Sequence, residues 1–303
     1  MHNYALDMKI RMRASDQIGY TPLVRISENL YAKLETCNPS GSIKDRLMSY
    51  IIDRAEKEHL LKKGDTIIES TSGNTGIALA MISAERGYNS VIVMPKNMSK
   101  EKKQMIKLLG AELIEVDEND FEQARGIRDL KAKSNTWFCP NQHYNPLCIE
   151  CYENTIGAEV IEQVKKMKKE ISAVILITGT GGTFIGIRKA LISIFPEIQF
   201  VAVEPDEPAN EFNNDSGGEN GLLGLGGGEK FFLDPNLVNE VMYLSASEAK
   251  QKTFQLMKDR GLRVGIPSGA NVLAAERWIK KNNPRGIVVT ILGDRADRYL
   301  SCL

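Results

Sequence analysis

Short runs of β-branched residues alternate with longer segments of helical periodicity, and this alternation limits the fold of the chain more than any other feature. The expected strands are residues 66–69, 91–94, 113–116, 173–178, 200–204 and 287–292. Apolar residues recur at helical spacing over residues 44–58, 75–86, 100–109, 121–132, 153–169, 184–193, 247–260 and 269–281. This alternation favours parallel sheets that are covered by helices on both faces. Because two such sets flank residues 139–152, the sequence predicts two α/β domains.

The turn before the first helix, residues 38–46 (NPSGSIKDR), is the most informative stretch for function. Pro39 and Gly41 break regular structure, and Lys44 then falls in the first helical turn. The positive end of the helix dipole disfavours a second cation, so the Lys44 pKa should fall, and burial would lower it further. An amine with a lowered pKa can attack a carbonyl group and form an imine. The alternative is an ordinary solvated lysine on the surface.

Composition excludes several functional classes. The chain has 303 residues, with 39 Lys and Arg against 39 Asp and Glu, which gives no support to nucleic-acid binding. No apolar run is long enough to span a membrane, and the N-terminus lacks the apolar core of a secretory signal. Five cysteines, an odd number, do not indicate a disulfide framework. We therefore expect a globular protein of the cytoplasm.

Two strand-to-helix turns have the composition of anion sites. Residues 70–76 (STSGNTG) combine hydroxyl groups with a helix start, which suits a small carboxylate, although such clusters also form ordinary loops. Residues 179–183 (GTGGT) could hold a phosphate on successive backbone N–H groups. A dinucleotide fingerprint would need a glycine at position 184, which is Phe184, yet Glu204 lies where a ribose-binding acid could sit. These residues alone leave an NAD-binding protein open.

Two later turns and one cluster have less specific signals. Ser268, in residues 265–270 (GIPSGA), could simply cap a helix, and residues 293–300 (GDRADRYL) could form a solvated turn. A zinc site is the other alternative, because four ligand-type residues are close in sequence: Cys139, His143, Cys148 and Cys151. Their spacing is not that of a standard zinc motif, and free cysteine is usually a small buried apolar residue. We therefore expect no metal.

Taken in order, these turns resemble the cysteine synthase (O-acetylserine sulfhydrylase) and cystathionine β-synthase family of pyridoxal phosphate enzymes. The matching segments are residues 18–25 (IGYTPLVR), 38–46 (NPSGSIKDR), 71–76 (TSGNTG), 179–183 (GTGGT), 267–270 (PSGA) and 297–301 (DRYLS). The resemblance implies the fold type II architecture, similar to the tryptophan synthase β subunit, with two α/β domains and twisted, mainly parallel sheets. Residues 45–147 would form a smaller mobile domain. Residues 1–44 and 148–303 would form the larger, cofactor-binding domain.

The same resemblance assigns roles to individual residues. Lys44 would hold pyridoxal 5'-phosphate as an imine and later act as general acid and base. The cofactor phosphate would bind to Gly179, Thr180, Gly181, Gly182 and Thr183. Ser268 would contact the pyridine nitrogen, and Asn74 the ring hydroxyl. The substrate α-carboxylate would be held by Thr71, Ser72, Asn74, Thr75 and Gln142.

The resemblance further implies β-replacement on an amino acid with a β leaving group, most simply O-acetylserine and sulfide giving cysteine and acetate, by a homodimer. One alternative is a cysteine desulfhydrase or lyase that releases hydrogen sulfide through an aminoacrylate; another is β-replacement with homocysteine or an amine. The chain departs from the usual family pattern at residues 224–229 (GLGGGE). Gly224 and Glu229 are therefore candidate substrate-binding residues, and Glu229 or Asp234 could assist water. A binding protein that keeps the fold without catalysis is a further alternative, which the intact Lys44 disfavours.

Overall fold

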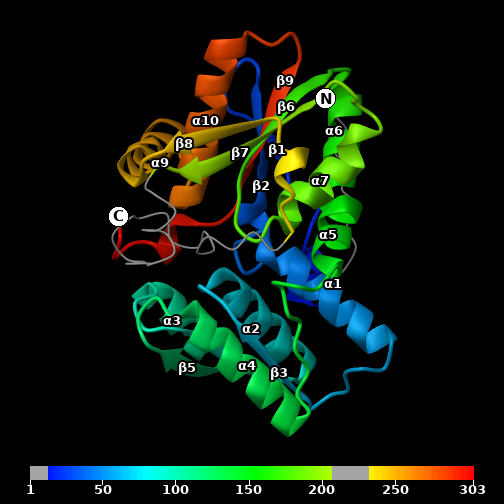
Figure 1. Cartoon of the computed structure of the whole chain (residues 1–303), viewed down its shortest axis with the longest axis vertical. Coiled ribbons are helices and arrows are strands. Elements are labelled where there is room, and N and C mark those ends of the chain that lie inside the picture. Colours follow the sequence, from blue (N-terminus) through cyan, green and yellow to red (C-terminus); the bar gives the residue numbers. More distant parts are fainter. Residues whose placement is uncertain (1–12, 207–231) are drawn as a thin grey trace, which may run out of the picture.

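Two separate sheets organise the chain, whose computed structural model describes residues 13–206 and 232–303. The larger sheet has the strand order β1-β2-β9-β6-β7-β8, and the smaller has the order β3-β4-β5. Figure 1 places the larger sheet in the upper part of the molecule and the smaller in the lower part. The strands are β1 (Leu23–Arg25), β2 (Leu30–Leu34), β3 (Thr66–Ser70), β4 (Asn89–Pro95), β5 (Glu112–Val116), β6 (Ile171–Ile177), β7 (Gln199–Pro205), β8 (Glu240–Leu244) and β9 (Ile287–Leu292). Among these strands only the β1–β2 pair is antiparallel.

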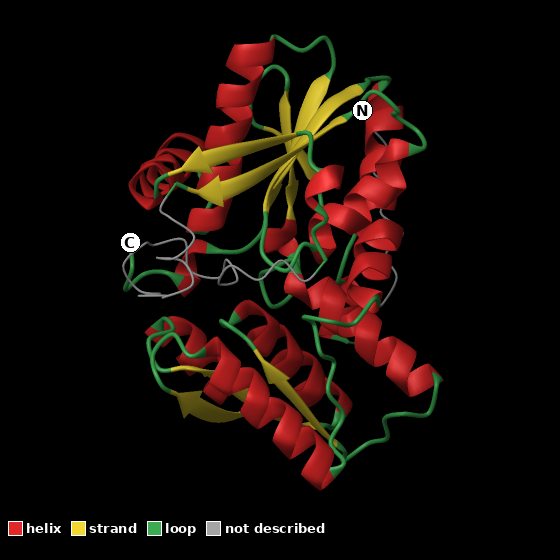
Figure 2. Ribbon diagram, in the orientation of Figure 1, coloured by secondary structure: helices red, strands yellow, loops and turns green. Residues whose placement is uncertain are grey.

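Helices cover both faces of each sheet, as Figure 2 shows for the larger one. The helices are α1 (Lys44–Lys57), α2 (Asn74–Arg86), α3 (Lys100–Leu108), α4 (Phe121–Asn135), α5 (Leu147–Tyr152), α6 (Ala158–Met167), α7 (Gly182–Ile192), α9 (Ala246–Arg260) and α10 (Ile266–Asn282). Side chains along a strand alternate between faces. In β6, Val174 and Leu176 therefore join the apolar cluster of α5, α6 and α7, while Ala173 and Ile175 join that of α9 and α10.

The smaller sheet is built in the same way. Ile67 and Ile92 face the side that α2 and α3 cover, whereas Ile68 and Val93 pack with Ala124 of α4. Parallel strands that are buried on both faces need nearly continuous apolar sequence, which explains why these runs are readable in the chain.

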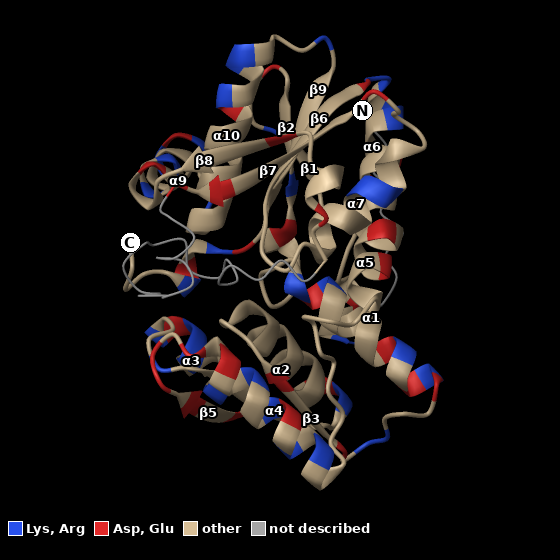
Figure 3. Ribbon diagram, in the orientation of Figure 1, with Lys and Arg blue, Asp and Glu red and all other residues tan. Residues whose placement is uncertain are grey.

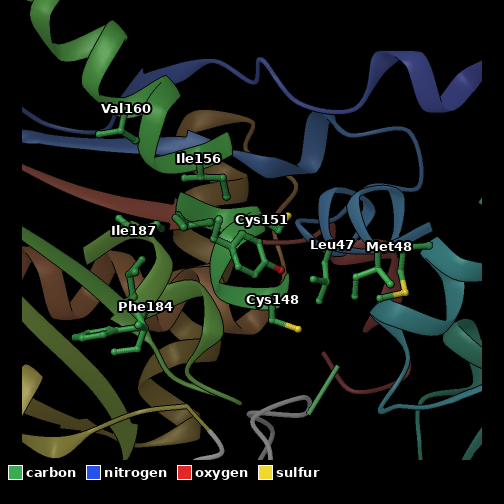
Figure 4. Close-up of a cluster of buried hydrophobic side chains, with 14 of the residues drawn as sticks. Leu47, Met48, Cys148, Cys151, Ile156, Val160, Phe184 and Ile187 are labelled. Carbon is green, nitrogen blue, oxygen red and sulfur yellow. The ribbon is translucent and has the colours of Figure 1, made fainter. Parts of the chain in front are cut away.

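One apolar cluster connects the two parts of the molecule through α1. It contains Leu47 and Met48 of α1 together with Cys148 and Cys151 of α5. Figure 4 shows these side chains beside Ile156, Val160, Phe184 and Ile187. Since Lys44 begins α1, this packing fixes the helix that carries it.

All six expected strands and the expected α/β class are confirmed, but three strands were not expected. In β2, Lys33 interrupts the apolar pattern, yet it is fully buried because it donates to the Thr21 carbonyl (2.6 Å) and pairs with Glu159 (2.7 Å). Strand β8 lies at the sheet edge, where exposed residues alternate with less exposed ones. The third is β1, only three residues long.

The expected single helix at residues 153–169 was wrong at its start. Helix α5 begins at Leu147, directly after Pro146, and a π-helical turn (Glu153–Gly157) joins it to α6. A Cβ on Gly157 would lie 2.4 Å from the Ala190 Cβ, so close packing against α7 accompanies the irregular turn.

The proposed domain boundaries stay a prediction, as does the mobility of residues 45–147.

Figure 3 shows Lys and Arg interspersed with Asp and Glu over both parts of the chain. None of the helices in the described residues is apolar over the length that a membrane crossing needs.

Candidate active site

The turn that carries Lys44 is anchored by the two residues that follow it. Asp45 accepts a hydrogen bond from the Ser40 backbone N–H at 2.6 Å. Arg46 forms buried ion pairs with Glu35 (2.7 Å) and Glu159 (2.6 Å). Burial raises the pKa of Asp45 to about 6, although its hydrogen bonds with Ser40 oppose the shift. The backbone at the start of α1 is therefore held from both sides.

The Lys44 amine itself is left available. No hydrogen bond or ion pair to another described residue holds it, and burial lowers its pKa below the usual value. The nearby Cys148, Cys151 and Glu69 oppose that shift but do not outweigh it. The lowered pKa confirms the direction predicted from sequence, with desolvation as the main cause. More of the amine is then neutral, which is the form that attacks a carbonyl group.

The glycine-rich turn of residues 179–183 lies where β6 ends and α7 begins. Gly181 caps α7 with φ +88°, and a Cβ there would lie 2.7 Å from the Leu233 backbone nitrogen. A Cβ on Gly182 would lie 3.2 Å from the Cys148 Cβ. The first N–H groups of a helix have no carbonyl partner within it, so this turn is a ready site for a phosphate.

The expected carboxylate clamp lies between β3 and α2. The Thr71 hydroxyl accepts from the Gly73 N–H at 3.0 Å, and Ser72 is half-buried in the same turn. The Thr75 hydroxyl donates to the Gln142 side-chain oxygen at 2.7 Å, and the Gln142 side-chain nitrogen donates to the Ser70 carbonyl at 3.1 Å. The structure thus places Gln142, from a distant part of the sequence, against Thr75 and Ser70, while its role in binding a carboxylate stays a prediction.

A buried ion pair behind the clamp holds Gln142, and no motif in the sequence indicates this pair. Glu69 pairs with Arg128 at 3.1 Å and accepts from the backbone N–H groups of Ser70 and Gln142, both at 2.9 Å. Burial raises the Glu69 pKa, while Arg128 and these donors oppose the shift. In the sequence, Glu69 is a single charged residue at the end of an apolar strand, and Arg128 is one of several charged residues of an amphipathic helix. Only the tertiary structure therefore reveals the pair.

Ser268 lies in the first turn of α10 and is not its N-cap, which is Gly265. The alternative of a simple capping serine was therefore wrong. The Ser268 hydroxyl accepts from the Gly293 N–H at 3.0 Å and keeps its own proton to donate. The Gly293 carbonyl in turn accepts from the Ile43 N–H at 2.9 Å. One residue thus connects Ser268 to the turn of Lys44.

The charged C-terminal turn is only partly solvated, contrary to the alternative from sequence. Asp297 is exposed, but Asp294 and Arg298 are both buried. The Asn74 side-chain nitrogen donates to Asp294 at 2.7 Å, and Arg298 donates to the Asn74 side-chain oxygen at 2.6 Å. Asn74, which begins α2, is consequently held in one orientation.

Cys148 lies between Gln142 and the phosphate turn, and sequence reasoning did not assign it a place in the site. Its thiol donates to the Gln142 carbonyl at 3.2 Å, and its Cβ lies against Gly182. Burial raises its pKa to about 12, so the thiol stays neutral. The only signal in the sequence is that Cys148 and Cys151 share a face of α5.

The zinc alternative finds no support in residues 13–206 and 232–303, where no group of three His, Cys, Asp or Glu side chains is arranged to hold a metal ion. Cys139 packs in a different apolar cluster from Cys148 and Cys151.

Gly224 and Glu229 lie outside the described residues. Asp234 is exposed and caps a short 3-10 helix by accepting from the Asn236 N–H at 2.9 Å.

Comparison with known proteins identifies the family. A family described as "Pyridoxal-phosphate dependent enzyme" matches residues 14–294. The chain belongs to the pyridoxal-phosphate dependent enzyme family. It is 36% identical over 296 residues to a cysteine synthase of Staphylococcus aureus, with 94% of each chain covered. The dinucleotide alternative is thereby set aside.

Solved structures of this family share the whole fold. The structure of O-ureido-L-serine synthase superimposes with a TM-score of 0.88 at 32% identity, covering 97% of this chain and 94% of that one. An O-acetylserine dependent cystathionine beta-synthase from Helicobacter pylori gives a TM-score of 0.86 at 33% identity, covering 97% and 98%. The fold type II architecture expected from sequence is confirmed.

The described residues fit pyridoxal 5'-phosphate, the cofactor of this family. The Lys44 amine is desolvated and without a hydrogen-bond partner among them. Leu233 and Cys148 lie close to the backbone of Gly181 and Gly182. A side chain at either glycine would therefore press against them and fill the space of the turn. Ser268 offers a neutral hydroxyl proton, which suits an unprotonated pyridine nitrogen.

Proposed function

We propose that this enzyme catalyses β-replacement on an amino acid with a β leaving group, with O-acetylserine and sulfide as substrates and cysteine and acetate as products. The observation that carries the proposal is the half-buried Lys44 side chain, whose amine has no hydrogen-bond partner among the described residues. Gly293 bonds to both Ser268 and the Ile43 N–H next to Lys44, and Cys148 lies between Gln142 and the phosphate turn. The cysteine synthase relative supports the choice of reaction, and the Helicobacter pylori relative supports the choice of donor.

The residues would hold the cofactor at three points. Lys44 would bind its aldehyde carbon, the N–H groups of residues 179–183 its phosphate, and Ser268 its pyridine nitrogen. Asn74 would face the ring hydroxyl. When bound, pyridoxal phosphate supplies an electron sink for the substrate α-carbon.

Two further groups of residues would act on the substrate. The clamp of Thr71, Ser72, Asn74, Thr75 and Gln142 would bind the α-carboxylate and orient the Cα–H bond toward Lys44. The Lys44 Nζ, whose pKa is lowered by burial, would accept the α-proton in its neutral form. Acetate would then leave the β-carbon, sulfide would add there as HS⁻, and Lys44 would return the proton to the α-carbon to complete the replacement. Closure of residues 45–147 on the bound carboxylate would exclude water.

The proposal includes two features that follow the family resemblance. We propose that the enzyme acts as a homodimer in the cytoplasm. Light scattering of the purified protein would give a mass near twice the 33.7 kDa of one chain. A mass of one chain at micromolar concentration would contradict the dimer and leave the reaction untouched.

The reaction is tested with purified enzyme loaded with pyridoxal phosphate. With O-acetylserine and sulfide, the wild type should form cysteine, and Lys44→Ala should form none above background. Lys57→Ala is the matched control, because Lys57 is the exposed last residue of the same helix. Absence of cysteine with the loaded wild type would refute the proposed substrates. Release of sulfide from cysteine alone at a higher rate would reverse the proposed direction.

A further inference from the structure

The C-terminal segment Asp294–Ser301, here called the latch, contacts both parts of the molecule. The Ser99 hydroxyl at the start of α3 donates to the Arg298 carbonyl at 2.9 Å. The Ser301 backbone N–H donates to Glu101 of α3 at 2.8 Å. On the opposite side, the Gly265 N–H before α10 donates to the Asp294 carbonyl at 2.9 Å. In Figure 1 the end of the chain, in red, lies between the upper and lower parts.

Within the latch, the Arg298 side chain joins two segments of the proposed site. One nitrogen of its guanidinium donates to the Asn74 side-chain oxygen at 2.6 Å. The other donates to the Ser40 carbonyl, in the turn that leads to Lys44. A planar group with fixed donor directions sets both partners at once.

Asp294 completes the restraint on Asn74. It accepts from the Asn74 side-chain nitrogen at 2.7 Å and from the Tyr299 hydroxyl at 2.5 Å. If the Asn74 amide were flipped, its oxygen would face the Asp294 carboxylate and its nitrogen the Arg298 guanidinium. Both contacts would be repulsive, so the amide has one stable orientation.

The position of Arg298 is not explained by an ion pair. The residue is 5% exposed, and none of the described carboxylates lies at salt-bridge distance from it, although its charge acts on the Asp45 carboxyl. Its side-chain hydrogen bonds to described residues go to uncharged oxygens of Asn74 and Ser40. Burying a guanidinium without a directly paired carboxylate is unfavourable, so these two contacts point to a role in the geometry of its partners.

We propose that Arg298 is a positioning residue that couples the carboxylate clamp to the turn of Lys44. This inference rests on the proposed function, because the clamp and Lys44 are assigned there. When the amino acid binds at residues 71–75, Arg298 holds the Lys44 turn at a fixed position relative to the clamp. Substrate binding and proton transfer then depend on the same side chain, whereas phosphate binding at residues 179–183 does not.

The test uses the enzyme loaded with pyridoxal phosphate and follows its absorption during titration with O-acetylserine or L-serine. Arg298→Met should raise the dissociation constant of the amino acid about tenfold or more, since hydrogen bonds from a charged donor are lost. It should also lower kcat and leave the cofactor content unchanged. Arg298→Lys should give an intermediate effect, and Ser99→Ala, which removes one bond to the latch, a smaller one. Asp297→Asn is the matched control, because Asp297 is exposed in the same short helix as Arg298.

Three results would overturn the proposal. The first is an unchanged dissociation constant and kcat in Arg298→Met. The second is a loss of cofactor and thermal stability with normal amino-acid binding by the remaining loaded enzyme, which would mean a purely structural role. If Arg298→Met does not fold, unchanged values in both Arg298→Lys and Ser99→Ala are the third. A loaded wild type that shows no response to any amino acid would refute the proposed function itself, so the two failures are distinguishable.

Discussion

Replacing Arg128 with methionine should destabilise the protein and weaken substrate binding together. Arg128 is the cation that pairs with Glu69 at 3.1 Å, and both side chains are at most 1% exposed. Removing one partner of a buried ion pair typically costs about 3–5 kcal/mol, because the other charge is left uncompensated. Glu69 would then take up a proton or move, and its bond to the Gln142 N–H at 2.9 Å would weaken.

The double variant separates the buried charge from the lost contacts. In Glu69→Gln/Arg128→Met no carboxylate is left buried at position 69, and the glutamine oxygen can still accept from the Gln142 N–H. We expect it to be more stable than Arg128→Met by roughly 2 kcal/mol, which is about half of the cost of the broken pair. The exposed pair Lys166–Glu162 (2.6 Å) is the control, since Lys166→Met should change stability by less than about 1 kcal/mol.

Urea unfolding followed by circular dichroism measures these differences, and steady-state kinetics gives the KM for the amino-acid donor. Arg128→Met should raise KM about tenfold, the effect of about 1.4 kcal/mol of lost positioning. A loss of stability below about 1 kcal/mol, or a double variant less stable than Arg128→Met, would refute the reasoning.

Three further predictions follow from single contacts. Gly186→Ala places a Cβ 2.5 Å from the Ile149 carbonyl, so urea unfolding should show a loss of about 1–3 kcal/mol; an unchanged midpoint would show that α7 moves freely. Burial lowers the Lys102 pKa to about 8, below its usual 10.5, so the unfolded chain holds this proton more tightly and stability from Lys102 should rise between these pH values. Lys102→Met should flatten that rise, and an identical pH profile would contradict it. Cys148→Ser keeps a donor to the Gln142 carbonyl and should retain most activity, whereas Cys148→Ala should raise KM; equal values in both would remove the thiol from the site.

The parts of the fold that follow from local pattern were predictable from the sequence. Buried strands with continuous apolar runs, followed by glycine and hydroxyl residues, locate residues 71–75 and 179–183. Lys44 was located by the turn with Pro39 and Gly41 and by the helical spacing after it. Strand β2 was missed because Lys33 reads as a surface residue until Glu159 is brought beside it. The same reason hid the Glu69–Arg128 pair, since a buried charge is recognisable only with its partner.

The contacts of the latch were also beyond the sequence. Asp294 and Arg298 form a charged turn that looks solvated, and their bonds to Asn74 span more than two hundred residues of chain. Ser268 looked like a helix cap because its helix starts two residues before it, at Ile266. Long-range hydrogen bonds of this kind leave no periodicity in a single sequence.

The central claim is that Lys44 carries the cofactor. Borohydride reduction would fix the bond between pyridoxal phosphate and its lysine in the loaded enzyme, and mass spectrometry of the digested protein would locate it. We predict a single modified lysine at position 44 in the wild type and no modified lysine in Lys44→Arg. Modification of another lysine in the wild type, or of none, would contradict the account.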